Sequence, residues 1–189
     1  MEFQLLTVFV VLSTLQFDLT LSQNCNEVPT FNISDCCKFP DIASEKMVHK
    51  IKQELAKTPN QSKYLKACRF YEKLFKRCDI VNSDNQIDKA AARKYFDAQI
   101  ADDDWKQIFA DAVDECIDDI NDEDFPTNSR CDVRFIAAYE CISLYAFRNC
   151  KDSDFTDCNQ CNTAKDFAEN CDGTRSMSRY LNNQICDCL

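Results

Sequence analysis

Fourteen cysteines place the strongest constraint on how this chain can fold. None of them falls among the first 24 residues, and they continue to the end of the chain. An even number of cysteines in a protein from an oxidising compartment indicates a disulfide framework. We therefore expect up to seven disulfides and no free thiol. The expected half-cystines are Cys25, Cys36, Cys37, Cys68, Cys78, Cys116, Cys131, Cys141, Cys150, Cys158, Cys161, Cys171, Cys186 and Cys188.

An apolar segment near the start of the chain predicts a cleavable leader. Leu5 to Leu15 carries no charge, and a run of this length is too short to span a bilayer. Thr20 and Ser22 are small residues at the spacing that signal peptidase requires. We therefore expect residues 1–22 to be a signal peptide and the protein to be secreted into the extracellular space.

Length and charge restrict the organisation and the partners of the mature chain. Residues 23–189 fit a single domain. The whole sequence has a net charge of −10, and without the two acidic residues of the leader, Glu2 and Asp18, the mature chain has −8 (−10 + 2). This acidic charge argues against nucleic acid and against an anionic membrane as partners. Two sequons, Asn32-Ile-Ser34 and Asn60-Gln-Ser62, predict glycosylation of Asn32 and Asn60.

The hydrophobic pattern of this domain is helical. The chain has one glycine and four prolines, so hairpins and glycine-rich loops are scarce. Apolar residues recurring at three- and four-residue steps predict an all-α fold. We expect Asp88 to cap one helix and Asp103 or Asp104 to cap the next. The predicted helices cover residues 41–57, 62–78, 89–100, 105–120 and 132–148, with short ones near 163–170 and 176–183.

Several cysteines lie within the apolar stripes of these helices. Half-cystines at Cys68, Cys116 and Cys141 would tie one helix to another. A bundle closed by such cross-links can enclose a small-molecule cavity, because its walls do not depend on tight packing alone. The alternative is that the same stripes simply pack on each other as a filled core, and periodicity alone slightly favours this interpretation.

The chain resembles the insect odorant-binding proteins of the Plus-C class. The resemblance begins at Cys36-Cys37-Lys38-Phe39-Pro40 and includes Ala67 to Glu72, the turn before Asp88 and the segment from Trp105 to Cys116. It extends to Cys141, which follows Cys131 after a gap of nine residues, and to Cys150, which follows Cys141 after a gap of eight. It also includes Cys161. It implies a bundle of about six or more helices, braced by disulfides, with a cysteine-rich C-terminal extension at 151–189 packed on the body.

The resemblance also implies disulfide pairings. It pairs Cys68 with Cys141 and Cys116 with Cys150. The chain departs from the family at Glu72, where a cysteine is usual, and at Lys151, where a proline is usual. We expect Cys78 to replace the missing cysteine and to pair with Cys36 or Cys37.

The function implied by the resemblance is that of a carrier for a small hydrophobic ligand, such as an odorant or pheromone. A chemosensory receptor or a second copy of the chain would be a further partner. The alternative is a secreted interaction protein without a cavity, acting in haemolymph or reproductive fluid. The residues expected to form the pocket wall are Leu74, Phe75, Trp105, Ile108, Phe109, Phe135, Tyr139, Ile142 and Tyr145.

Catalytic and metal-dependent functions find little support in the residues. The chain has a single histidine, His49, and no nucleophile in its local context suggests a catalytic triad. Cys158 and Cys161 have the spacing of zinc ligands, but in an oxidising compartment disulfides are expected. The acidic run between Asp111 and Asp124 lacks the glycine of an EF-hand loop and is interpreted as a solvated helix face. We therefore expect no enzyme activity, no cofactor and no metal.

Overall fold

The computed structural model describes residues 32–58, 61–123, 125 and 130–171. The predicted leader, Cys25, Asn60, the predicted helix at 176–183, Cys186 and Cys188 lie outside the described residues. Within them the chain is all-helical, with seven α-helices, no strand and two isolated β-bridges. The helices are α1 (Ile33–Cys36), α2 (Glu45–Ala56), α3 (Lys63–Arg77), α4 (Lys89–Gln99), α5 (Asp103–Asp122), α6 (Arg134–Arg148) and α7 (Asn159–Asn170).

Side-chain caps determine where several of these helices begin. The Asp88 carboxylate accepts the backbone N–H of Ala91 at 2.9 Å, so the predicted cap of α4 is confirmed. The prediction that Asp103 or Asp104 caps α5 was wrong, because Asp102 is the cap and accepts the N–H of Trp105 at 3.0 Å. Asp103 and Asp104 instead occupy the first turn, where carboxylates interact favourably with the helix dipole.

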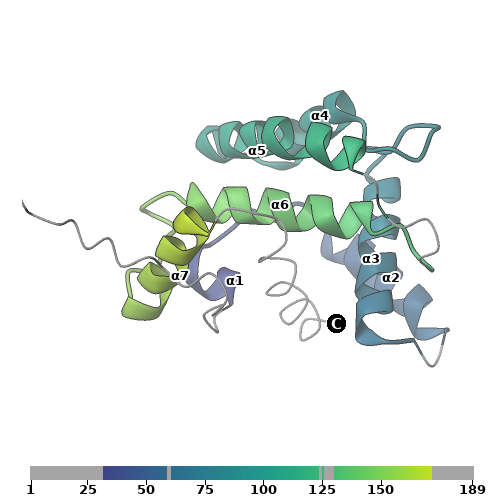
Figure 1. Cartoon of the computed structure of the whole chain (residues 1–189), viewed down its shortest axis with the longest axis horizontal. Helices are drawn as coiled ribbons and strands as arrows, with labels where there is room; N and C mark the ends of the chain where they lie inside the picture. Colours follow the sequence, from purple (N-terminus) through teal and green to yellow (C-terminus); the bar gives the residue numbers. More distant parts are fainter. Residues whose placement is uncertain (1–31, 59–60, 124, 126–129, 172–189) are drawn as a thin grey trace, which may run out of the picture.

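Helix α6 is the axis of the bundle (Figure 1). It packs against α5, α3 and α7, while α4 packs on α5 and α2 on α3. Helices α4 and α5 form a layer along one side of α6, α2 and α3 cross one of its ends, and α1 and α7 lie at the other end (Figure 1). Val113 and Ile117 of α5 and Ala138 of α6 are fully buried, which places the core along this axis.

Four disulfides brace the described part of this arrangement. They join Cys36 to Cys161, Cys37 to Cys150, Cys68 to Cys131 and Cys116 to Cys141. Cys171 is disulfide-bonded as well. A disulfide framework of this kind is typical of proteins from an oxidising, extracellular compartment.

The pairings implied by the resemblance were wrong. Because α3 crosses the N-terminal end of α6 (Figure 1), Cys68 reaches Cys131, which precedes α6, and does not reach Cys141. Cys141 lies further along α6, on the side that packs against α5, and pairs there with Cys116. Cys150 lies just beyond the end of α6, next to α1, and pairs with Cys37.

The expectation that every cysteine forms a disulfide was also wrong. Cys78 and Cys158 remain thiols. Cys78 follows α3, whereas its expected partners, Cys36 and Cys37, lie beside α7 at the other end of α6 (Figure 1). Cys158 is exposed at the start of α7, and its sulfur accepts the backbone N–H of Cys161 at 3.3 Å.

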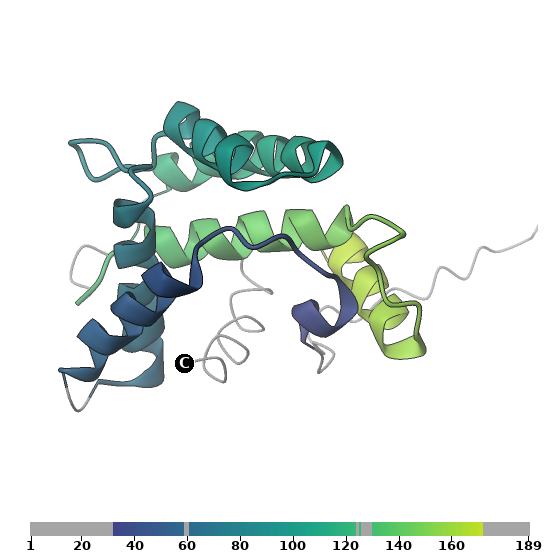
Figure 2. The same ribbon diagram turned by 180° about the vertical axis from the view of Figure 1, so that it is seen from behind.

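An irregular segment at residues 37–44, which we call the strap, connects α1 to α2. It runs across the face of α6 from one end of the molecule to the other (Figure 2). Its first residues are fixed by the bond between the Lys38 N–H and the Asp154 carbonyl, at 2.9 Å. The strap therefore covers a side of α6 that α5 does not occupy.

Candidate ligand-binding pocket

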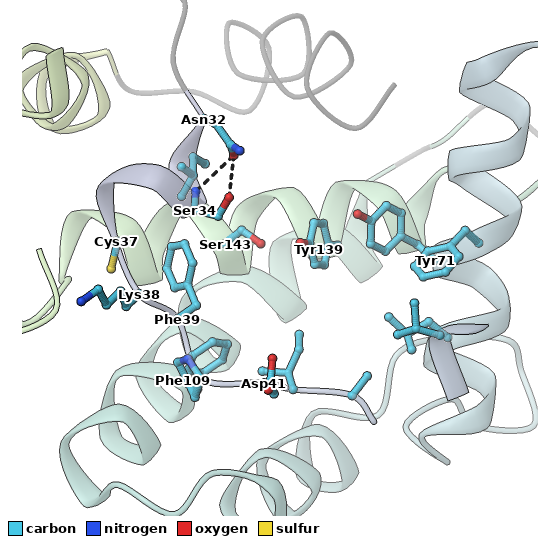
Figure 3. A pocket seen from close by; sticks show the side chains of 17 residues that line it. Asn32, Ser34, Cys37, Lys38, Phe39, Asp41, Tyr71, Phe109, Tyr139 and Ser143 are labelled. Atoms are coloured by element: carbon cyan, nitrogen blue, oxygen red, sulfur yellow. Dashed lines mark hydrogen bonds between the residues drawn. The ribbon is translucent and has the colours of Figure 1, made fainter. Parts of the chain in front are cut away.

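A pocket of about 600 Å³ lies between the strap and the helices that it crosses. Small-molecule sites usually have volumes of roughly 300–1,000 Å³, so the space suits a compact organic ligand. Figure 3 shows Phe39 and Asp41 of the strap and Tyr139 and Ser143 of α6 around the same space. Its wall consists of Asn32, Ile33, Ser34, Cys37, Lys38, Phe39, Pro40, Asp41, Ile42, Ala43, Val48, Phe70, Tyr71, Leu74, Phe109, Tyr139 and Ser143.

Most of this wall is apolar and aromatic. Phe70, Tyr71 and Leu74 extend from adjacent turns of α3, and each is less than 9% exposed. Tyr71 stacks on Tyr139 of α6, with ring centroids 4.1 Å apart. Aromatic rings bury large areas and pack against ligands of many shapes, so the wall favours an apolar molecule.

Few polar groups line the pocket, and they lie at different depths in it. Lys38 and Asp41 are exposed and carry opposite charges, so they form a rim with no net charge. Tyr139 and Ser143 are half-buried one turn apart on α6. Neither hydroxyl donates a hydrogen bond to another described residue, which leaves both hydrogens available to a ligand carbonyl or hydroxyl group.

Three of the nine residues expected to form the wall lie around this pocket. Leu74 comes from α3, Phe109 from α5 and Tyr139 from α6. The convergence of these helices on one space was expected from their apolar stripes. Whether the three residues bind a ligand remains a prediction.

The other six expected residues lie elsewhere in the bundle. The rings of Phe75 and Phe135 pack together 5.8 Å apart in the core between α3 and α6. Trp105 is buried behind Phe39 and Phe109, and its indole N–H donates to Asp154 at 2.8 Å. The remaining three, Ile108, Ile142 and Tyr145, are buried or half-buried outside the pocket wall.

Sequence reasoning missed the strap, and it also missed the helical wall residues Val48, Phe70, Tyr71 and Ser143. Phe39, Pro40, Ile42 and Ala43 line the pocket but belong to no helix. An irregular segment has no hydrophobic period, so the helical hydrophobic pattern that predicted wall residues in the helices could not identify the strap. The available signal was the group of apolar residues shortly after Cys37, namely Phe39, Pro40 and Ile42.

The predicted glycosylation site at Asn32 falls at the edge of the pocket. Asn32 caps α1, and its side-chain oxygen accepts from the N–H and the hydroxyl of Ser34, at 3.2 and 2.8 Å. Its amide nitrogen, the atom that a glycan would modify, is not part of these bonds. Glycosylation of Asn32 and Asn60 stays a prediction.

His49 and the acidic run lie away from the pocket. His49 is exposed on α2 and shares a hydrogen bond of 2.9 Å with Gln53. On α5, Asp118 pairs with Lys89 at 2.6 Å, and Asp114 pairs with Arg93. The described residues contain no group of three His, Cys, Asp or Glu side chains placed to hold a metal ion.

Comparisons with known proteins do not assign a family. No family model matches the chain, and no curated protein shows a significant match to it. The helices of the described residues include none with the length and hydropathy needed to cross a membrane.

Proposed function

We propose that this protein is a secreted carrier that binds one small hydrophobic molecule in the pocket beneath the strap. The pocket's apolar wall, formed by the strap together with α3, α5 and α6, is the single observation that carries the proposal. The resemblance to Plus-C odorant-binding proteins suggests that the ligand is an odorant, a pheromone or another semiochemical.

The wall favours a neutral ligand with one hydrogen-bonding group. An apolar body would lie against Phe39, Tyr71 and Phe109. A carbonyl or hydroxyl group would accept from Tyr139 or Ser143. A net charge on the ligand would lose hydration inside the wall without an opposite charge there to replace it.

Filling the pocket is the most direct test by mutation. Ser143→Phe adds a ring at a half-buried position that lines the pocket. We expect a displaceable fluorescent apolar probe, N-phenyl-1-naphthylamine, to bind this variant at least about tenfold more weakly, a loss of roughly 1.4 kcal/mol. Ser83→Phe, the same change in an exposed turn, is the matched control and should bind the probe like the wild type.

The thermal midpoint of the same variants separates a cavity from a filled core. If the space is a cavity, Ser143→Phe should unfold at or above the temperature of the wild type. If it is a filled core, the added ring would overpack it and cost about 1–3 kcal/mol. A lowered midpoint in a chain that binds no probe would favour the alternative, a secreted interaction protein without a cavity.

A further inference from the structure

The strap is attached to the rest of the described protein at few points. Beyond Lys38, whose N–H bonds to Asp154, the only backbone–backbone hydrogen bond of the strap to a described residue before Ser44 caps α2 is the local one from the Phe39 N–H to the Cys37 carbonyl. Residues 40–43 make no backbone–backbone hydrogen bond with any described residue. The disulfide between Cys37 and Cys150 fixes one end of the strap, and α2 fixes the other end.

One side-chain hydrogen bond holds the middle of the strap. The Tyr95 hydroxyl of α4 donates to the Ile42 carbonyl at 2.7 Å. Tyr95 is not among the residues that line the pocket, whereas Ile42 is. Burial, together with the neighbouring Cys78 thiol, raises the pKa of Tyr95 well above its ordinary value, so the hydroxyl keeps its proton and remains a donor at physiological pH.

The strap is also linked to the only tryptophan of the chain. Phe39 packs on Trp105 with ring centroids 5.9 Å apart, and Trp105 is only 3% exposed. Moving the strap away from the pocket would withdraw Phe39 from the indole. The emission of Trp105 therefore reports the position of the strap with or without a ligand.

We propose that the strap is a movable wall through which ligand enters and leaves, and that Tyr95 is the positioning residue that holds this wall closed through the Ile42 carbonyl. Ligand passage rests on the proposed carrier function, but the position of the strap does not. Closure would place Phe39 and Ile42 against the ligand. Opening would break the Tyr95–Ile42 hydrogen bond and the Phe39–Trp105 ring contact, and it would expose the side chains of Phe39, Ile42 and Ala43, which pack against the core.

Tyr95→Phe tests this role because it removes the hydroxyl and keeps the ring that packs on Phe96. We expect dissociation of N-phenyl-1-naphthylamine, followed by stopped flow, to become about two- to tenfold faster, the range that an ordinary hydrogen bond supplies. Without ligand, acrylamide should quench Trp105 emission more strongly than in the wild type. Tyr145→Phe is the matched control, since Tyr145 is a half-buried tyrosine outside the pocket wall.

The two measurements separate the possible failures. Unchanged quenching and an unchanged dissociation rate in folded Tyr95→Phe would overturn the proposal. A wild type that binds no probe would refute the carrier function, while the quenching experiment would still decide whether Tyr95 holds the strap. If Tyr95→Phe does not fold, Pro40→Gly loosens the strap directly, and its quenching should rise if the strap moves and stay unchanged if it does not.

Discussion

Glu140 is a buried carboxyl group on the axial helix α6. Its side chain is 8% exposed, and burial raises its pKa to about 8. Tyr64 of α3 lies near it. Burial raises the pKa of that tyrosine, and the charge on Glu140 raises it further. A carboxyl group in such a site stays neutral at neutral pH because its ionised form would lose hydration.

The buried carboxyl makes the stability of the fold depend on pH. In the unfolded chain Glu140 releases its proton near its ordinary pKa of 4.5, whereas the folded protein keeps it until about pH 8. Between these values the folded state binds more protons, so the free energy of unfolding should fall as pH rises. Glu140→Gln cannot ionise and should be more stable than the wild type at pH 8.5 by about 2–4 kcal/mol.

Urea unfolding at pH 5 and at pH 8.5 measures this difference. Glu169→Gln, at an exposed position of α7, is the control and should keep the pH dependence of the wild type. Equal pH dependence in Glu140→Gln and the wild type would show that Glu140 is not buried in the folded protein.

At the scale of helices, sequence periodicity was a good guide, whereas the disulfide pairings implied by the family resemblance were wrong. The helices from α2 to α6 match predicted ranges closely because each buries at least two apolar residues at helical spacing. Helix α1 was not predicted, because its four residues are too few to show a hydrophobic period. The pairing of Cys68 with Cys131 depends on how α3 crosses α6. The spacing of the cysteines along the sequence does not determine this crossing.

The two thiols should respond differently to alkylation. Cys158 is exposed, whereas Cys78 is half-buried and burial raises the pKa of its thiol. Because the thiolate is the reactive form, iodoacetamide should modify Cys158 first in the native protein and both residues after denaturation without reductant. Peptide mapping by mass spectrometry identifies the modified residues.

The same map tests the disulfides between helices. It should contain the Cys68–Cys131 and Cys116–Cys141 linked peptides. A Cys68–Cys141 peptide, or the absence of any modified Cys78 and Cys158, would contradict this arrangement of α3, α5 and α6.

At the scale of the whole molecule, the braced bundle and the pocket depend on each other. Disulfides fix α1 to α7, the strap to the end of α6, and α5 to α6. The strap, which is not a helix, bounds the space between these fixed elements. The space is therefore not filled by a helix. Sequence alone predicted that the apolar stripes converge, but it could not decide between a cavity and a filled core, because both bury the same residues.

The proposed carrier function requires that the pocket beneath the strap take up one apolar molecule. Trp105 is the only tryptophan in the chain and lies one ring away from the pocket, behind Phe39. Titration of the wild type with N-phenyl-1-naphthylamine, recording energy transfer from Trp105 to the bound probe, measures this uptake. We expect saturable transfer at one probe per chain with a dissociation constant on the order of micromolar, about −8 kcal/mol. Transfer that does not saturate, or no transfer up to the solubility limit of the probe, would contradict the carrier function.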